Sequence, residues 1–210
     1  AFNPGLLCCA GDVVSVAYAG IAGGVFGTVL LRSTDGGLNW AAPRLLRGNS
    51  FPRLIASYGN DLCIHFGDQR TTASGMLGSS DAGLTWEVRT TNAPLLTDMQ
   101  ITATQLHAVG EYDLGLHHEA GYYYSYDRGR SWGGPQPISR EDAAVSSVPH
   151  VAVDEEETIY VVWNDTGAVT MRKSDGFNAD DELLWGPEVL LSEMRGAIFP
   201  DIAAGGPFVS

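Results

Sequence analysis

Three copies of one short motif, Ser-x-Asp-x-Gly-x-x-Trp, constrain this chain more than any other feature. They read STDGGLNW, SSDAGLTW and SYDRGRSW, and their aspartates are Asp35, Asp81 and Asp127. The intervals 81 − 35 and 127 − 81 both equal 46 residues, and a constant interval of this length is typical of a repeated structural unit. A fourth, degraded copy follows in KSDGFNADDELLW, where Asp175 and Trp185 take the motif positions. The motif residues of the first three copies are Ser33, Asp35, Gly37, Trp40, Ser79, Asp81, Gly83, Trp86, Ser125, Asp127, Gly129 and Trp132.

Each repeated unit contains four short apolar stretches. In the second unit they are FPRLIAS, NDLCIHF, SGMLGS and a stretch that begins LTWEVR. They are rich in Val, Ile, Leu and Tyr across the chain, and Gly, Asp and Pro separate them, as is typical of β-strands and turns. No segment keeps the i, i+3, i+4 apolar spacing of an amphipathic helix. The sequence therefore predicts an all-β propeller built from four-stranded antiparallel blades.

Aligning the units sets the expected blade boundaries. We expect four full blades at about residues 3–50, 51–96, 97–147 and 148–198, within one domain over residues 1–210. Residues 199–210 contain FPDIAAG and predict the start of a fifth blade, with one strand and part of a second. An open array would leave sheet edges unpaired. Three arrangements therefore stay open: a piece of a larger propeller, a small closed ring, or self-association of two chains through their blade edges.

The motif has a mechanical interpretation that needs no ligand. Asp and Ser side chains can bond to the backbone of a tight turn, Gly can adopt a positive φ, and Trp can pack over the hairpin. Calcium prefers about six to eight oxygen ligands, and each turn offers too few. We therefore expect Asp35, Asp81 and Asp127 to be structural, and we expect no metal and no cofactor.

The three motifs resemble the Asp-box, or bacterial neuraminidase repeat, of sialidases and related β-propellers, and the resemblance extends over essentially the whole chain. It implies a six-bladed parent fold and a working face on the side opposite the motif turns. It also implies a sialidase-like glycoside hydrolase that acts on terminal acidic sugars in a central pocket. Asp-box propellers include noncatalytic carbohydrate- or protein-binding members and polysaccharide lyases, so these functions stay open as alternatives.

The expected working face is formed by the start of each first strand and by the loop between the second and third strands. A sialidase-like mechanism needs arginines that grip a carboxylate, a tyrosine nucleophile beside a glutamate, and an aspartate as acid and base. The resemblance makes Tyr122 and Glu119 candidates for the nucleophile pair and Asp68 the candidate acid, although Tyr122 lies inside a predicted strand. Trp163 suits stacking on a sugar ring, with core packing as the alternative. The substrate-binding candidates are Arg53, Arg70, His117, His118, His150, Trp163, Asn164, Asp165 and Asp201.

Charge narrows the expected partners. The formal net charge of −13 argues against nucleic acid and anionic membranes, because both attract basic surfaces. A glycan is the partner that the resemblance implies. The chain starts at Ala1. A removed signal peptide, a trimmed tag and an excised fragment all fit this start, and the first of them would indicate secretion.

Overall fold

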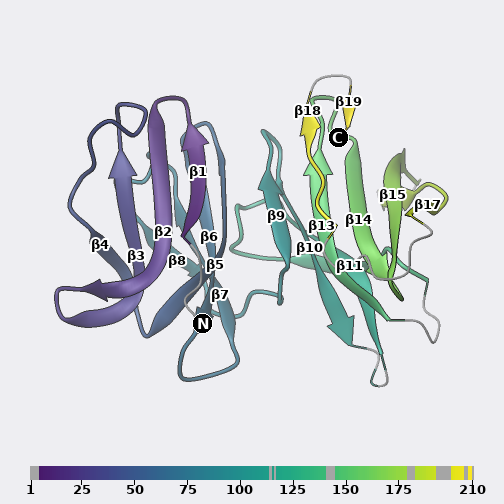
Figure 1. Ribbon diagram of the computed structural model, residues 1–210, viewed down its shortest axis with the longest axis horizontal. Helices are drawn as coiled ribbons and strands as arrows, with labels where there is room; N and C mark the ends of the chain where they lie inside the picture. Colours follow the sequence, from purple (N-terminus) through teal and green to yellow (C-terminus); the bar gives the residue numbers. More distant parts are fainter. Residues whose placement is uncertain are drawn as a thin grey trace. The chain divides into compact units, whose positions relative to one another are not determined.

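Every regular element in the described residues of the computed structural model is a β-strand (Figure 1). The described residues contain no helix long and apolar enough to cross a membrane. The strands fall into two compact units. The first unit comprises Ala1–Pro94, Ala103–Leu106 and Ser125–Trp132, and the second comprises Leu95–Thr102, His107–Tyr124 and Gly133–Ser210. The structure describes residues 5–113, 115, 117–140, 145–178, 183–192, 200–205 and 208–209.

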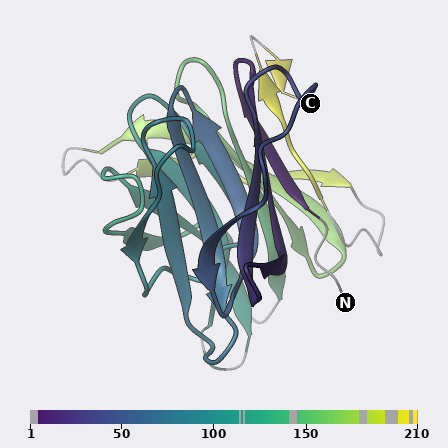
Figure 2. The ribbon, with the colours of Figure 1, turned by 90° about the vertical axis from the view of Figure 1, so that its left-hand side faces the viewer.

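The first unit holds two four-stranded antiparallel sheets, drawn in purple to blue in Figures 1 and 2. Each sheet follows chain order, so its strands are joined by consecutive hairpins. Blade 1 consists of β1 (Leu6–Ala10), β2 (Val13–Ala22), β3 (Val25–Ser33) and β4 (Arg44–Gly48). Blade 2 consists of β5 (Ser50–Tyr58), β6 (Asp61–Asp68), β7 (Ser74–Ser79) and β8 (Glu87–Thr90).

Two further sheets repeat this plan. Blade 3 consists of β9 (Asp98–Ile101), β10 (Leu106–Asp113), β11 (His118–Ser125) and β12 (Gly133–Pro137). Blade 4 consists of β13 (Ser146–Val153), β14 (Ile159–Asp165), β15 (Ala168–Phe177), β16 (Leu183–Trp185) and β17 (Val189–Ser192). Here β16 and β17 share the fourth position, because they pair with different halves of β15. The prediction of four-stranded antiparallel blades is confirmed.

The last described residues differ from the sequence prediction. Two short strands, β18 (Ala204–Gly205) and β19 (Phe208–Val209), pair with each other in a small antiparallel sheet. The sequence predicted one strand and part of a second in this region. Two strands can form in so short a segment because a hairpin needs only a few residues between its strands.

Middle strands carry the core because both of their faces are covered. In β6 the six residues from Leu62 to Gly67 are all buried, and all six residues of β7 are buried. In the second unit a cluster that includes Val109, Tyr122 and Trp163 packs between the sheets of blades 3 and 4. Burial on both faces explains why these strands read as continuous apolar runs rather than as alternating ones.

The motif turns are closed by side-chain hydrogen bonds to the backbone. In blade 2 the Ser79 hydroxyl donates to Asp81 Oδ1 at 2.8 Å and accepts the Gly83 N–H at 2.9 Å. The Thr85 hydroxyl donates to Asp81 Oδ2 at 2.5 Å, and the Trp86 indole N–H donates to the Gly83 carbonyl at 3.0 Å. Hydrogen bonds from the Thr85 hydroxyl and N–H lower the pKa of Asp81 to about 2. Both oxygens of the Asp81 carboxylate therefore accept hydrogen bonds within the same turn.

The bonds of the motif serine and aspartate recur in the other two complete copies. Gly37 N–H donates to Ser33 Oγ at 2.9 Å, and Gly129 N–H donates to Ser125 Oγ at 2.6 Å. The three motif glycines have φ values of 90°, 82° and 92° in chain order, a region that residues with a Cβ rarely adopt. The residue before each Trp, namely Asn39, Thr85 or Ser131, bonds through its side chain to the motif aspartate.

The degraded fourth copy has a different structure. Asp175 lies inside β15 and not in a turn, and Gly176, with a φ of 82°, follows it directly. Lys173 stands where the other copies have their serine. Ser174 uses its hydroxyl to accept the Ile159 N–H at 2.9 Å. The expectation of an Asp-box turn at Asp175 is therefore wrong, because the shifted serine and glycine cannot make the turn's bonds.

Side chains of β9 bond to the backbone of β13. Asp98 Oδ2 accepts the Val151 N–H at 3.0 Å. The Gln100 amide accepts the Val153 N–H at 2.9 Å and donates to the Val153 carbonyl at 3.1 Å. These bonds join blades 3 and 4 through side chains, with no sheet ladder between the two strands.

Candidate functional site

Arg53 lies at an irregular point of β5 in the first unit. The pairing of β5 with β6 shifts register between Pro52 and Leu54, and such bulges re-aim a side chain. The Arg53 guanidinium carbon lies 5.3 Å from the centroid of the Phe51 ring. Its Nε is buried and bonds to none of the described residues, and no carboxylate among them lies within ion-pair distance of Arg53. This half-buried guanidinium is suited to an external anion.

His65 on β6 is close enough to Arg53 to feel its charge. Burial, followed by the charge of Arg53, lowers the pKa of His65 to about 4, so the ring is neutral at physiological pH. Its Nε2 lies 3.1 Å from the Pro94 carbonyl and must carry the proton in that bond. Its Nδ1 is buried and has no hydrogen-bond partner among the described residues. From sequence alone, His65 is only a histidine on an apolar strand, and nothing there indicates that it neighbours Arg53.

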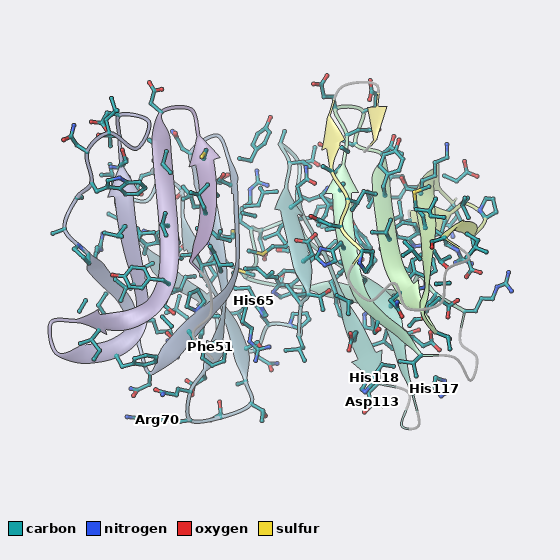
Figure 3. The ribbon with its side chains drawn as sticks, viewed as in Figure 1. Phe51, His65, Arg70, Asp113, His117 and His118 are labelled. Carbon is teal, nitrogen blue, oxygen red and sulfur yellow. The ribbon has the colours of Figure 1, made fainter. Side chains whose placement is uncertain are left out.

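Asp68 and Arg70 follow at the end of β6. Asp68 Oδ1 accepts the Arg70 N–H at 2.8 Å, and Asp68 Oδ2 lies 3.7 Å from Arg47 Nη2. The Arg70 N–H is the main cause that lowers the pKa of Asp68. A general acid needs a raised pKa, so Asp68 in this state is suited to accept hydrogen bonds and not to donate a proton. The Arg70 side chain is exposed in the turn after β6 (Figure 3).

In the second unit, Asp98 of β9, His150 of β13 and Asp201, which precedes β18, come together. His150 Nδ1 lies 3.5 Å from Asp98 Oδ2 and 3.7 Å from Asp201 Oδ1. The hydrogen bond to Asp98 is the main cause that raises the pKa of His150. Val148, two residues earlier, has a φ of 52°, and the register of β13 shifts here as it does at Arg53. A positive φ at a β-branched residue is strained, and such strain is common near functional residues.

Glu119 lies in β11 and is fully buried. Its Oε2 accepts the Ser139 hydroxyl at 2.6 Å, and its Oε1 lies 3.6 Å from His117 Nε2. His117 and His118 lie with Asp113 at the same end of the second unit (Figure 3). The sequence did not indicate the contact with Ser139, because Ser139 lies twenty residues from Glu119 and belongs to no motif.

Tyr122 does not pair with Glu119. It is 2% exposed, and its hydroxyl lies 2.8 Å from His107 Nδ1 in the core. Successive side chains of a strand point to opposite faces, so residues three apart in β11 diverge. The expectation of a Tyr122 nucleophile beside Glu119 therefore fails on geometry.

The remaining candidates support local structure. Trp163 is fully buried in the core of the second unit, which excludes sugar stacking and leaves the core-packing alternative. Asn164 Oδ1 accepts the Gly167 N–H at 3.1 Å, and Asp165 Oδ1 accepts the Thr166 hydroxyl at 3.3 Å. Both residues shape the turn between β14 and β15. Within the described ranges, no group of three or more His, Cys, Asp or Glu side chains is arranged to hold a metal.

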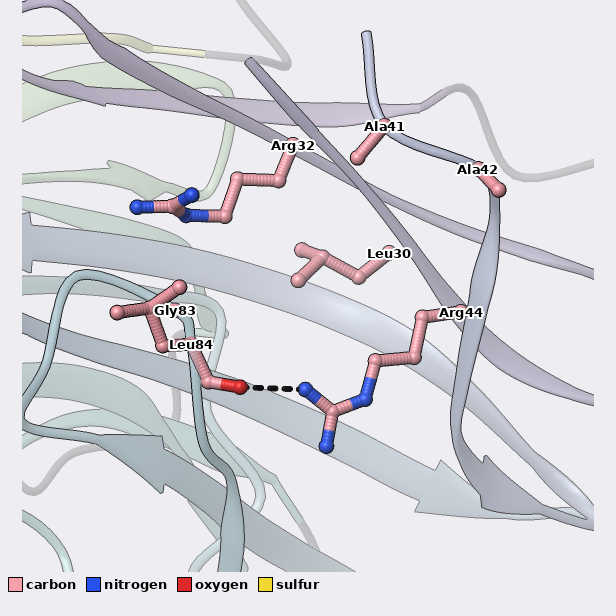
Figure 4. Close-up of a pocket in the computed structure, with 7 residues that line it drawn as sticks. All are labelled: Leu30, Arg32, Ala41, Ala42, Arg44, Gly83 and Leu84. Carbon is pink, nitrogen blue, oxygen red and sulfur yellow. Dashed lines mark hydrogen bonds between the residues drawn. The ribbon is translucent and has the colours of Figure 1, made fainter. Parts of the chain in front are cut away.

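A shallow pocket in the first unit is lined by none of these candidates. Arg32 Nε donates to the Ala82 carbonyl at 2.6 Å, and Arg44 Nη1 donates to the Leu84 carbonyl at 2.5 Å (Figure 4). Both arginines thus tie blade 1 to the motif turn of blade 2. Because they act as structural links here, the pocket is not the predicted carboxylate site. The lining residues are Leu30, Arg32, Ala41, Ala42, Arg44, Gly83 and Leu84.

Comparison with known proteins identifies the fold. No protein-family model matches the sequence, and no curated protein matches it. A protein of unknown function from Dyadobacter fermentans is similar in structure, with a TM-score of 0.59, 18% identity, and coverage of 95% of this chain and 68% of that one. An α-L-arabinanase from Penicillium chrysogenum, solved with arabinobiose, gives a TM-score of 0.59 at 12% identity, covering 95% and 70%. The intramolecular trans-sialidase from Ruminococcus gnavus, solved with oseltamivir carboxylate, gives a TM-score of 0.53 at 11% identity. That match covers 93% of this chain and 71% of the trans-sialidase chain.

These similarities and the four antiparallel blade sheets, three of four strands and one of five, define a β-propeller protein. At such low identity the similarity concerns the fold alone. The function has to be argued from the side chains of this chain.

Proposed function

We propose that this chain belongs to a glycan-processing propeller, a sialidase-like glycoside hydrolase that acts on terminal acidic sugars. The observation that carries the proposal is the half-buried Arg53 guanidinium, which has no carboxylate partner among the described residues. Phe51 lies 5.3 Å from the guanidinium carbon and holds the group by stacking. The remaining N–H groups form a planar fork that matches a sugar carboxylate.

Two further observations support an anionic sugar at Arg53. The neighbouring His65 stays neutral at physiological pH, so the site carries the charge of Arg53 without a second buried cation. One of the compared structures, the trans-sialidase, was solved with a carboxylate-bearing ligand. A partly desolvated guanidinium attracts a carboxylate more strongly than an exposed one does, because solvent screens the interaction less.

The test is turnover of a fluorogenic sialoside by the chain and by an Arg53→Gln variant. A lost charge-assisted pair costs about 1.5–3 kcal/mol, so we expect kcat/KM to fall by roughly 10- to 150-fold. Arg140→Gln is the matched control, because Arg140 is 73% exposed and pairs with Glu188 on the surface. Equal turnover by the wild type and Arg53→Gln, or no turnover by either, contradicts the proposal.

A noncatalytic glycan-binding propeller is the second candidate. It is favoured by the position of Tyr122 in the core and by the lowered pKa of Asp68, which leave the expected nucleophile and acid unassigned. Binding of acidic glycans on an array, lost in Arg53→Gln and without product formation, would support it. An unsaturated uronate product would instead indicate a lyase.

A further inference from the structure

The carboxylate of Glu119 has an unusual environment in the second unit. It is fully buried, and its Oε2 accepts the Ser139 hydroxyl at 2.6 Å. The Ser139 oxygen itself accepts the Ala120 N–H at 2.9 Å, which leaves the hydroxyl proton free to point at Glu119. Oε1 accepts no hydrogen bond from any described residue. One oxygen of the carboxylate is therefore held by a hydrogen bond, and the other is buried without one among the described residues.

Glu119 Oε1 faces one titratable side chain among the described residues. His117 Nε2 lies 3.6 Å from Glu119 Oε1, and no arginine or lysine among the described residues lies within ion-pair distance of Glu119. A buried carboxylate without a counter-charge costs several kcal/mol. The imidazole of His117 is therefore the group placed to balance the Glu119 carboxylate.

His117 also has access to solvent. Its side chain is 22% exposed, whereas that of Glu119 is fully buried. With Nε2 directed at the buried carboxylate, Nδ1 is the ring nitrogen left to accept a proton from outside. A base held by a buried carboxylate, which is itself held by a third group, is the general arrangement of an activated proton acceptor.

We propose that His117 is a general base, that Glu119 is its positioning residue, and that Ser139 fixes Glu119. In the proton-transfer step, the O–H bond of a water molecule or glycan hydroxyl breaks and its proton moves to Nδ1. The electron pair stays on the oxygen, which becomes the nucleophile. Nε2 keeps its proton, and the imidazolium charge is balanced by the Glu119 carboxylate. The separation of 3.6 Å is longer than a hydrogen bond, as is common for catalytic pairs without ligand.

The dyad itself can be tested without a substrate. Imidazole ¹H–¹⁵N NMR of the full chain should show a slowly exchanging Nε2–H signal, assigned to His117 by its loss in His117→Gln. Glu119→Gln should remove or strongly shift this signal, whereas His118→Gln should leave it unchanged. Ser139→Ala, a smaller change, should shift it if Glu119→Gln does not fold. A His117 signal that is absent, or is unchanged in Glu119→Gln and Ser139→Ala, overturns the proposal.

The catalytic role rests on the proposed function and is tested in the same sialoside assay. His117→Gln should lower kcat by about 10²- to 10⁴-fold with a small change in KM, the range typical of a lost general base. Wild-type-like kcat in this variant refutes the role of His117 as a base. Coupled NMR signals without any turnover refute the hydrolase function but leave the dyad standing. Turnover without coupled signals refutes the dyad and leaves the function standing.

Discussion

The glycines of the three complete motif turns allow one stability prediction to be worked out in detail. Gly37, Gly83 and Gly129 occupy the same motif position, have φ values of 90°, 82° and 92°, and all lie in the first unit. Replacing each glycine with alanine imposes nearly the same backbone strain. We expect this strain to cost about 1–3 kcal/mol at each site, offset by roughly 0.4–1 kcal/mol from the stiffer unfolded chain.

Packing separates the three sites. An added Cβ would lie 3.6 Å from Trp40 at Gly37 and 3.5 Å from Arg32 at Gly83, which are ordinary contacts. At Gly129 it would lie 2.7 Å from Cγ of Met76, a side chain that is fully buried. Overpacking of a buried site costs a further 1–3 kcal/mol or so. We therefore expect Gly129→Ala to be the most destabilising of the three.

Urea and thermal unfolding of the three variants measure this difference. For a chain of this size, 1 kcal/mol corresponds to a change in Tm of about 2–4 °C. Gly37→Ala and Gly83→Ala should therefore agree within a few degrees, with Gly129→Ala clearly lower. Equal losses of stability at all three sites would show that the Met76 side chain moves away from the added Cβ without destabilising the protein. A largest loss at Gly37 would refute the reasoning from contacts altogether.

Three further predictions concern histidines and tryptophans. Burial lowers the pKa of His65 to about 4, so the protein should lose on the order of 3 kcal/mol of stability as the pH falls from 6.5 towards 4. His65→Gln should flatten the pH dependence of urea unfolding in this range. The pKa of His150 is raised, mainly by its hydrogen bond to Asp98, so the stability gained from this contact is fully present below pH 6.5 and is lost as the pH rises through the raised value. Asp98→Asn should weaken this dependence in the same urea series, with Asp201 left to sustain the rest, and an unchanged profile would contradict the pairing. Trp163→Ala should cost about 3–5 kcal/mol in thermal unfolding, and much more than Trp40→Ala, because Trp163 is fully buried and Trp40 is 43% exposed; similar losses would argue against the core assignment.

The motif spacing was sufficient to predict the blades, because each copy carries its own turn chemistry. Ser79, Asp81 and Gly83 make local bonds that depend on four or five neighbouring residues, and such bonds follow directly from sequence. The contribution of Thr85 was not anticipated, since a residue before Trp carries no turn signal by itself. Asp175 was misassigned because a match at one position was taken to imply the bonds of the whole motif.

The candidate site was harder to predict, because it depends on strand register. Glu119 and Tyr122 are close in sequence, yet alternation along β11 places them on opposite faces. Strand register also determines the orientation of Trp163 in β14, whose side chain packs in the core. In contrast, His150 and Asp201 were both predicted from their equivalent places at the starts of first strands, and the structure brings them to 3.7 Å.

The bonds from β9 to β13 have a consequence for how this protein avoids aggregation. Val151 and Val153 donate their N–H groups to the side chains of Asp98 and Gln100. A strand edge with free N–H groups is a template on which another chain can add a strand. At these two positions an incoming strand would find the donors already engaged. Polar side chains of one blade thus block strand addition at the edge of the next blade. Gln100→Ala should leave the Val153 N–H unpaired and favour intermolecular strand addition at that edge.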